Sequence, residues 1–178
     1  MKRLLVLALV CLAVVSCKKD EDDDNNSNNG NSVTNPCPNV SGYTEIPDTI
    51  FEQALINLGH DDVIDGQVLS FNICSFDSLN LELRGISNLT GIEGFIALTF
   101  LNCPYNYLTS LDISNNTALT FLDFSYNLLT SLDISNNTAL TYLQCDANQL
   151  TSLDVSNNTA LDELHCVENQ LTSLDVSN

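Results

Sequence analysis

The sequence predicts a repeat solenoid of the α/β type, in which coils joined by a parallel β-sheet are covered at the N-terminal end by a short helix. Three observations predict it: a repeat of 119 − 98 = 21 residues, a leucine pattern inside each copy, and an amphipathic segment before the first copy. The copies open at Leu98, Leu119, Leu140 and Leu161. A fixed period of this kind is typical of stacked architectures, because a single coil cannot bury its apolar side chains alone.

Each copy follows the pattern LxxLx(C/F)xxN, which in the first copy places Leu98, Leu101, Cys103 and Asn106. This spacing is the leucine-rich-repeat signature, in which one short strand per coil lines a face of a horseshoe. The second half of the coil, residues 108–116, repeats the spacing, so halves of 10 residues (98 to 108) and 11 residues (108 to 119) are nested in each copy. We expect the leucines to form buried columns and the asparagine amides to bond backbone groups in the turns.

The segment LTSLDISNNTALTFL resembles surface leucine-rich-repeat proteins of the Bacteroidetes, and this resemblance covers residues 98–178. An earlier unit of 98 − 76 = 22 residues contains GISNLTGIEGF and resembles an internalin-type repeat with a helical turn on its convex side. Arg84 stands there in place of the expected asparagine. Residues 46–59, IPDTIFEQALINLG, are similar to the helical N-terminal caps of internalin-like proteins.

The cap segment carries its own helix signals. Asp48 is suited to begin a helix and Gly59 to end it. The apolar residues expected on one helical face are Ile50, Phe51, Leu55 and Leu58. We therefore assign residues 36–75 to an N-terminal cap and residues 76–178 to leucine-rich repeats, of which the last is incomplete.

The first residues predict export. Residues 1–16 hold Lys2 and Arg3 followed by an apolar run too short to span a membrane, as in a signal peptide. The sequence VVSC at residues 14–17 resembles a bacterial lipobox, which implies lipidation of Cys17; an ordinary signal peptide with an unmodified cysteine is the alternative. The following KKDEDDD resembles the acidic signal that sends Bacteroidetes lipoproteins to the outer face of the outer membrane. Residues 17–35 are acidic and rich in asparagine, so we expect a disordered tether.

The net charge of −18 limits the possible partners. Five Lys and Arg stand against 23 Asp and Glu, and residues 17–178 alone carry 3 − 23 = −20. Such a surface repels nucleic acid and anionic lipid heads. We therefore expect no nucleic-acid partner, membrane contact only through the lipid anchor, and a monomer.

The outward positions of the repeat vary from copy to copy and form the candidate ligand-binding site. They are separated from the buried leucines because alternate strand residues point to opposite faces. The candidate residues are Phe100, Phe121, Tyr142, Tyr105, Tyr126, Asn102, Asp123, Gln144 and His165. Exposed aromatic rings with polar neighbours suit an extracellular protein or a glycan. The alternative is cross-strand stacking that only stabilises the sheet.

Acidic residues offer two weaker candidates for cation sites. One aspartate per coil forms a column: Asp112, Asp133, Asp154 and Asp175. Bound cations or hydroxyls such as those of Ser110 and Ser114 would relieve its charge repulsion, and we favour the hydroxyls. The loop after Asp61 does not match an EF-hand, because Val63 and Asn72 stand where carboxylates are needed. We assign no metal site.

The cysteines differ in expected state. Cys37 and Cys74 both lie in the cap region of an exported protein, so we expect them to form a disulfide. Cys103, Cys145 and Cys166 fall on the inward column that also holds Phe124, and we expect buried thiols there. A disulfide between Cys145 and Cys166 on adjacent coils remains open.

Catalysis finds no support in the sequence. His60 and His165 are the only histidines, and no GxSxG, HExxH or P-loop pattern occurs. We predict a non-enzymatic, lipid-anchored surface protein without a cofactor that binds or adheres to a protein or a glycan. The alternatives are a structural stalk that presents a missing C-terminal domain, suggested by the ending inside a coil at Asn178, and an accessory module of an enzyme.

Overall fold

The computed structural model describes residue 37 and residues 40–176. The chain divides into two units, residues 1–34 and 35–178, and every described residue belongs to the second. The predicted signal peptide, Cys17 and the tether lie outside the described residues and stay predictions. Among the described residues, no helix has both the length and the apolar character needed to cross a membrane.

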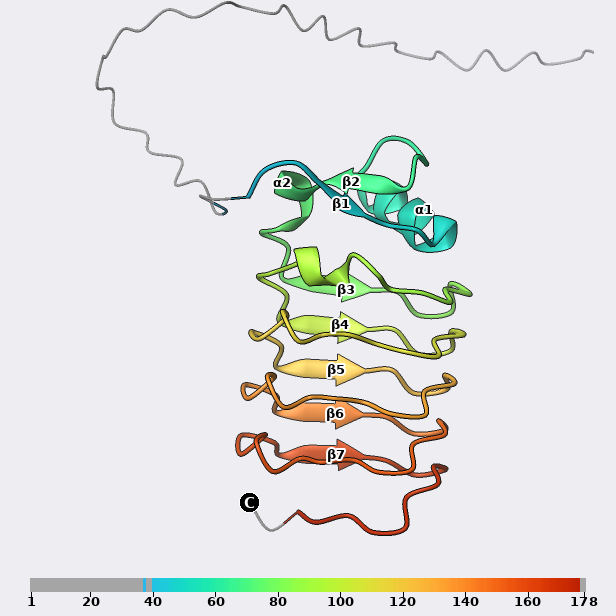
Figure 1. Ribbon diagram of the computed structural model, residues 1–178, viewed down its shortest axis with the longest axis vertical. Helices are drawn as coiled ribbons and strands as arrows, with labels where there is room; N and C mark the ends of the chain where they lie inside the picture. The colour runs from blue at the N-terminus through green and yellow to red at the C-terminus, as the bar shows by residue number, and fades with distance from the viewer. Residues whose placement is uncertain (1–36, 38–39, 177–178) are drawn as a thin grey trace, which may run out of the picture. The chain divides into compact units, whose positions relative to one another are not determined.

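Five parallel strands form one sheet with one strand per coil, and the coils follow one another in sequence order (Figure 1). The strands are β3 (Ser78–Asn80), β4 (Phe100–Asn102), β5 (Phe121–Asp123), β6 (Tyr142–Gln144) and β7 (Glu163–His165). Their central leucines, Leu79 to Leu164, are direct partners in each successive pair. The predicted leucine-rich-repeat fold is therefore confirmed, with no shift of register between coils.

The core consists of apolar columns that run through the stacked coils. The side chains of Leu101, Leu122 and Leu143 are completely buried. Cys103 and Phe124 are also fully buried, and they share a column. Strands of neighbouring coils lie about 4.8 Å apart, so each coil packs directly on the apolar side chains of the next.

The asparagine that ends each half-pattern joins adjacent coils. Asn127 Nδ2 donates hydrogen bonds to the carbonyl oxygens of Cys103 (3.1 Å), Phe124 (2.9 Å) and Ser125 (3.2 Å). Its Oδ1 accepts from the Leu108 N–H at 3.0 Å. Equivalent bonds occur at Asn106, Asn148 and Asn169. This confirms the expected role of the asparagine amides in satisfying turn backbone.

Helix α1 (Thr49–Leu58) has the predicted ends. Asp48 Oδ1 accepts from the N–H groups of Ile50 and Phe51, and Gly59 closes the helix with a φ of 81°. The predicted face is partly wrong, because Ile50 and Leu58 are each 45% exposed. Ile50 is turned about 100° from the buried Phe51, and Leu58 lies at the helix end. The buried residues are Phe51, Glu52, Ala54 and Leu55.

The buried Glu52 was not predicted, and its role is to hold a loop. Its Oε1 accepts from the backbone N–H groups of Asp65 (2.8 Å), Gly66 (2.6 Å) and Gln67 (3.2 Å). Short elements complete the cap region: β1 (Tyr43–Glu45) pairs antiparallel with β2 (Gln67–Leu69), which leads into α2 (Ser70–Ile73). The 3₁₀ turn η1 (Ile92–Gly94) confirms the helical turn expected in the first unit. The predicted disulfide between Cys37 and Cys74 is present, with Cα atoms 6.2 Å apart.

Asp48 also ties the helix to the first coil. Its Oδ2 accepts from the Ser87 N–H (2.9 Å), the Ser87 hydroxyl (2.9 Å) and the Asn88 N–H (3.0 Å). Partial burial raises the pKa of Asp48, but the hydrogen bonds from Ser87, Phe51 and Asn88 outweigh it and lower the pKa below its ordinary value. The ionised form is therefore stabilised by the fold.

This shift predicts a pH dependence of stability. A carboxyl whose pKa is lowered on folding adds stability above its unfolded pKa, and that stability is lost as the pH falls through the folded pKa. Asp48→Asn should lower the unfolding free energy at pH 7 by about 1–2 kcal/mol, and the difference from the wild type should narrow between pH 5 and pH 3. Urea unfolding across this range measures it. Asp162→Asn is the control, because this exposed carboxylate makes no hydrogen bond to the described residues. If the difference in unfolding free energy between Asp48→Asn and the wild type stayed constant from pH 7 to pH 3, the prediction would be contradicted.

Candidate ligand-binding surface

Three aromatic rings stack on the outer face of the sheet. The Phe100 and Phe121 ring centroids are 4.4 Å apart with planes 14° apart, and those of Phe121 and Tyr142 are 4.5 Å apart with planes 4° apart. The rings come from directly paired positions of β4, β5 and β6 and are half-buried. We call Phe100, Phe121 and Tyr142 the strand-face ladder. The structure thus brings together three residues that the sequence predicted as a site.

The stacking decides which part of each ring a ligand can reach. Because the three strands pair in register, the rings lie one over the next along the direction of the strand hydrogen bonds. Both faces of Phe121 are covered, one by Phe100 and the other by Tyr142. The strand-face ladder therefore presents ring edges outward, and ring edges carry the positive part of the aromatic quadrupole.

A second stack lies just after the ends of β4 and β5. The rings of Tyr105 and Tyr126 are 4.3 Å apart with planes 9° apart, and each residue is 46% exposed. Both have a φ of 54°, in the left-handed region that non-glycine residues seldom adopt. Partial desolvation and the neighbouring Tyr126 raise the pKa of Tyr105, and Glu82 and Asp123 add to the effect. We call Tyr105 and Tyr126 the tyrosine pair.

Three exposed apolar residues beside the tyrosine pair were missed by sequence reasoning. Leu83 is 70% exposed, Tyr107 63% and Leu128 42%. Aligning the copies would have shown them, since Leu83 falls in the column of Tyr105, and Tyr107 in the column of Leu128.

The third residues of β4 to β7 form a second outward column, and its members Asn102 and Asp123 are engaged in hydrogen bonds within the protein. Asn102 Nδ2 donates to Asn80 Oδ1 at 3.0 Å. Asp123 was predicted as an exposed contact residue, but it is only 9% exposed. Its Oδ1 accepts from the Ser125 N–H (2.8 Å) and the Ser125 hydroxyl (2.7 Å), so this carboxylate serves the turn that follows β5.

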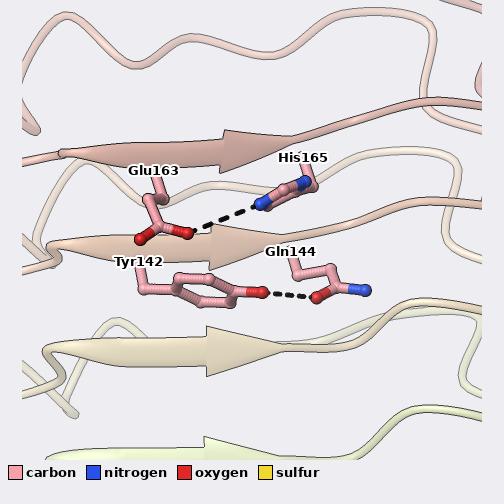
Figure 2. A network of polar contacts seen from close by, with 4 residues as sticks. All are labelled: Tyr142, Gln144, Glu163 and His165. Atoms are coloured by element: carbon pink, nitrogen blue, oxygen red, sulfur yellow. Dashed lines mark hydrogen bonds and ion pairs between the residues drawn. The ribbon is translucent and has the colours of Figure 1, made fainter.

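Four polar side chains on β6 and β7 extend the outer face of the sheet beyond the aromatic rings (Figure 2). The Tyr142 hydroxyl donates to Gln144 Oε1 at 2.5 Å, and His165 Nε2 lies 3.7 Å from Glu163 Oε2. The His165 ring is 5.6 Å from the Tyr142 ring and tilted by 41°. Desolvation raises the pKa of Tyr142, and the carboxylates of Asp123, Glu163 and Asp146 contribute. The outer face thus changes from aromatic on β4 and β5 to hydrogen-bonding and charged on β7.

The aspartate column is satisfied by its own turns. Asp112 Oδ1 accepts from the Ser114 N–H (3.0 Å) and hydroxyl (2.7 Å), and Asp133 and Asp154 accept from the N–H two residues later. These hydrogen bonds lower the pKa values of the three carboxyls. They support the structural interpretation of the column. Across residues 40–176, no three or more His, Cys, Asp or Glu side chains are arranged to hold a metal ion.

The inward cysteines are free thiols. Cys103 and Cys145 are buried, whereas Cys166 on the last described coil is half-exposed, which corrects the expectation that all three are buried. Burial raises the pKa of the Cys145 thiol to about 12. These thiols are therefore neutral members of the apolar column and not candidate nucleophiles.

No protein-family model and no curated protein matches the chain. Solved structures do match. The functional domain of InlJ from Listeria monocytogenes, which includes a cysteine ladder, is 38% identical with a TM-score of 0.72, over 78% of this chain and 31% of that one. The internalin InlF of the same species is 21% identical with a TM-score of 0.61, over 72% of this chain and 46% of that one. A leucine-rich-repeat protein of Leptospira interrogans is 26% identical with a TM-score of 0.50, over 58% and 28% of the two chains.

This chain therefore spans less than half the length of each of these proteins. The chain resembles InlJ both in fold and in sequence, whereas it resembles InlF in fold alone. The described part of the chain is an internalin-like leucine-rich-repeat solenoid.

Proposed function

We propose that the chain is a binding module that recognises an extracellular protein through the strand-face ladder and the tyrosine pair. One observation carries the proposal: the fold does not require aromatic residues at these positions. Glu163 occupies the ladder column in β7 and Glu168 the column of the tyrosine pair, yet β7 pairs with β6 in the same register as the other strands. Aromatic residues that the scaffold can replace by glutamate are available for recognition.

The orientation of the rings favours a protein over a glycan. A sugar ring gains most from an aromatic side chain by lying flat on its face, and a cation also needs the face. In the strand-face ladder the neighbouring rings cover those faces. Ring edges instead suit the aliphatic side chains and aromatic faces that a protein surface offers. The similarity to internalin repeats supports a binding role in general.

The sequence of residues 1–35 supports a proposal for the setting of this module. In our proposal, residues 1–16 direct export, the lipid on Cys17 holds the protein at the outer membrane, and the acidic segment to residue 35 is a tether that separates the repeats from the membrane. The module binds as a monomer and without catalysis. A stalk that only carries another domain would need neither the strand-face ladder nor the tyrosine pair.

The test is the double variant Phe121→Ala with Tyr142→Ala, assayed on arrays of extracellular proteins and of glycans. The wild type should bind a protein saturably, and the variant should bind it at least tenfold more weakly. Its unfolding free energy should fall by about 2–5 kcal/mol, from two ring contacts worth about 0.5–1.5 kcal/mol each and from the lost burial of two half-buried rings. Ser110→Ala with Ser131→Ala, in the other half of the coil, is the matched control. Undiminished binding by a folded ladder variant, or binding to glycans alone, would refute the proposal.

A further inference from the structure

Exposed apolar residues lie just beyond the carboxyl ends of β3, β4 and β5. Figure 1 shows the backbone of the turns that carry them. These residues are all at least 42% exposed and come from three successive coils: Leu83, Tyr105, Tyr107, Tyr126 and Leu128. We call these five residues the edge patch. It adds Leu83, Tyr107 and Leu128 to the tyrosine pair.

Backbone hydrogen bonds make the edge patch continuous from coil to coil. The Leu83 N–H donates to the Pro104 carbonyl at 3.1 Å, and the Tyr105 N–H donates to the Ser125 carbonyl at 3.0 Å. Tyr107 donates from its N–H to the Ile86 carbonyl at 2.8 Å, and its ring lies over Gly85, 3.8 Å from where a Cβ would be. Large side chains on neighbouring coils are thereby held next to one another.

Three members of the edge patch occupy strained backbone. Leu83, Tyr105 and Tyr126 have φ values of 55°, 54° and 54°. Asparagine or glycine adopts this conformation more readily than leucine or tyrosine does. The same position has a positive φ in all five described coils, so the coil imposes this conformation. Large exposed apolar side chains at three of these positions, where asparagine or glycine would be less strained, indicate a role outside folding. Ala147 in the next coil has the same backbone conformation, with a φ of 50°, without a large side chain.

Negative charge lies next to the edge patch. Glu82 directly precedes Leu83 in the chain, and the charges of Glu82 and Asp123 act on the Tyr105 hydroxyl. Arg84, which follows Leu83, is the single Lys or Arg in residues 20–178, so the other charged residues of the repeats are acidic. An apolar patch within an acidic surface complements a partner that carries apolar side chains among basic ones.

We propose that the edge patch is a docking surface for a basic protein. This protein would place an apolar side chain against Leu83 and the tyrosines, and its lysines or arginines near the carboxylates of Glu82 and Asp123. This inference rests on the proposed function, because it names the class of the protein that the module binds. It adds two requirements that the strand-face ladder alone does not make. The partner must be basic, and the binding must weaken with salt.

The test uses substitutions that relieve backbone strain, which offsets the loss of the Tyr105–Tyr126 ring contact, and the unfolding of each variant is measured beside its binding. Leu83→Asn, Tyr105→Asn and Tyr126→Asn are combined in one variant, and Ala147→Asn is the matched control in the same column. The probe is a panel of extracellular proteins of known isoelectric point, titrated at 50 mM and 300 mM NaCl. We expect the bound proteins to be basic, binding to weaken at least tenfold at the higher salt, and the triple variant to lose at least tenfold in affinity. Its unfolding midpoint should stay close to that of the wild type, because the relief of strain at three residues balances the lost ring contact.

The outcomes separate this inference from the proposed function. If the strand-face ladder variant loses binding while the triple variant binds like the wild type, the edge patch proposal is overturned and the proposed function stands for the strand-face ladder alone. If the bound proteins are acidic or their binding is insensitive to salt, the edge patch proposal is overturned and the proposed function stands. If the wild type binds no protein of the panel, both are overturned.

Discussion

Replacing Asn127 by alanine should lower the free energy of unfolding by about 3–5 kcal/mol. The side chain is 5% exposed and makes four hydrogen bonds, of which those with the Leu108 N–H and the Cys103 carbonyl join it to the preceding coil. Alanine would leave the buried Leu108 N–H unpaired, which costs about 1–3 kcal/mol. The carbonyls of Cys103, Phe124 and Ser125 would each lose one of two donors, because they also accept from Asn106 Nδ2, Asn148 Nδ2 and the Tyr105 N–H, and each lost bond adds about 0.5–1.5 kcal/mol. The sum is not additive, because the coils can relax and admit water. Urea unfolding followed by circular dichroism measures the change.

Asn136→Ala is the matched control for this prediction. Asn136 belongs to the same sequence repeat, but it is exposed and donates only one long hydrogen bond, 3.3 Å to the Ser114 carbonyl. Its replacement should cost less than about 0.5 kcal/mol, as expected for surface substitutions. Equal losses for the two variants would mean that the asparagine amides do not hold the coils together.

Gly91→Ala should be the second strongly destabilising change, with a loss of roughly 3 kcal/mol or more. Gly91 has a φ of 102°, and a Cβ there would meet Ile46 Cδ1 and approach the Glu45 carbonyl oxygen to 2.5 Å. Positive φ alone costs about 1–2 kcal/mol for an L-residue, and overpacking adds about 1–3 kcal/mol. Because the Glu45 carbonyl is backbone, the end of β1 must move away from the first coil.

Gly66→Ala separates the two costs. Gly66 has a φ of 86°, but a Cβ there would meet no atom within 4 Å. This variant should show only the backbone cost of about 1–2 kcal/mol. Thermal unfolding of both variants gives the comparison. A Gly91→Ala loss no larger than that of Gly66→Ala would contradict the close contact between the cap region and the first coil.

Much of the fold could be predicted from the sequence because the repeat itself encodes the neighbours of each residue. Once Leu101, Leu122 and Leu143 are aligned, their stacking follows, and so does the burial of Asn127 between two coils. The cap region lacks this redundancy. Its strands β1 and β2 occur once, so no second copy can be aligned with them, and the burial of Glu52 depends on a loop 13 residues away in sequence.

The candidate surface was predictable where it lies on a strand and less so where it lies in a turn. Alternation along the strand placed Phe100, Phe121 and Tyr142 outward, and their stacking follows from the register. The burial of Asp123 was not predictable from alternation, because it depends on hydrogen bonds from Ser125. Leu83 was missed because the first unit has 22 residues and breaks the 21-residue alignment.

Hydroxyl-radical footprinting of the module, with and without a protein that it binds on the array, tests the central claim most directly. Tyr105, Tyr126 and Tyr142 belong to the proposed surface, whereas Tyr43 in the cap region is 65% exposed and serves as the internal control. We predict that the partner protects the three tyrosines of the surface from oxidation and leaves Tyr43 as reactive as before. Protection of Tyr43 with unchanged reactivity of the other three would contradict recognition through the aromatic surface.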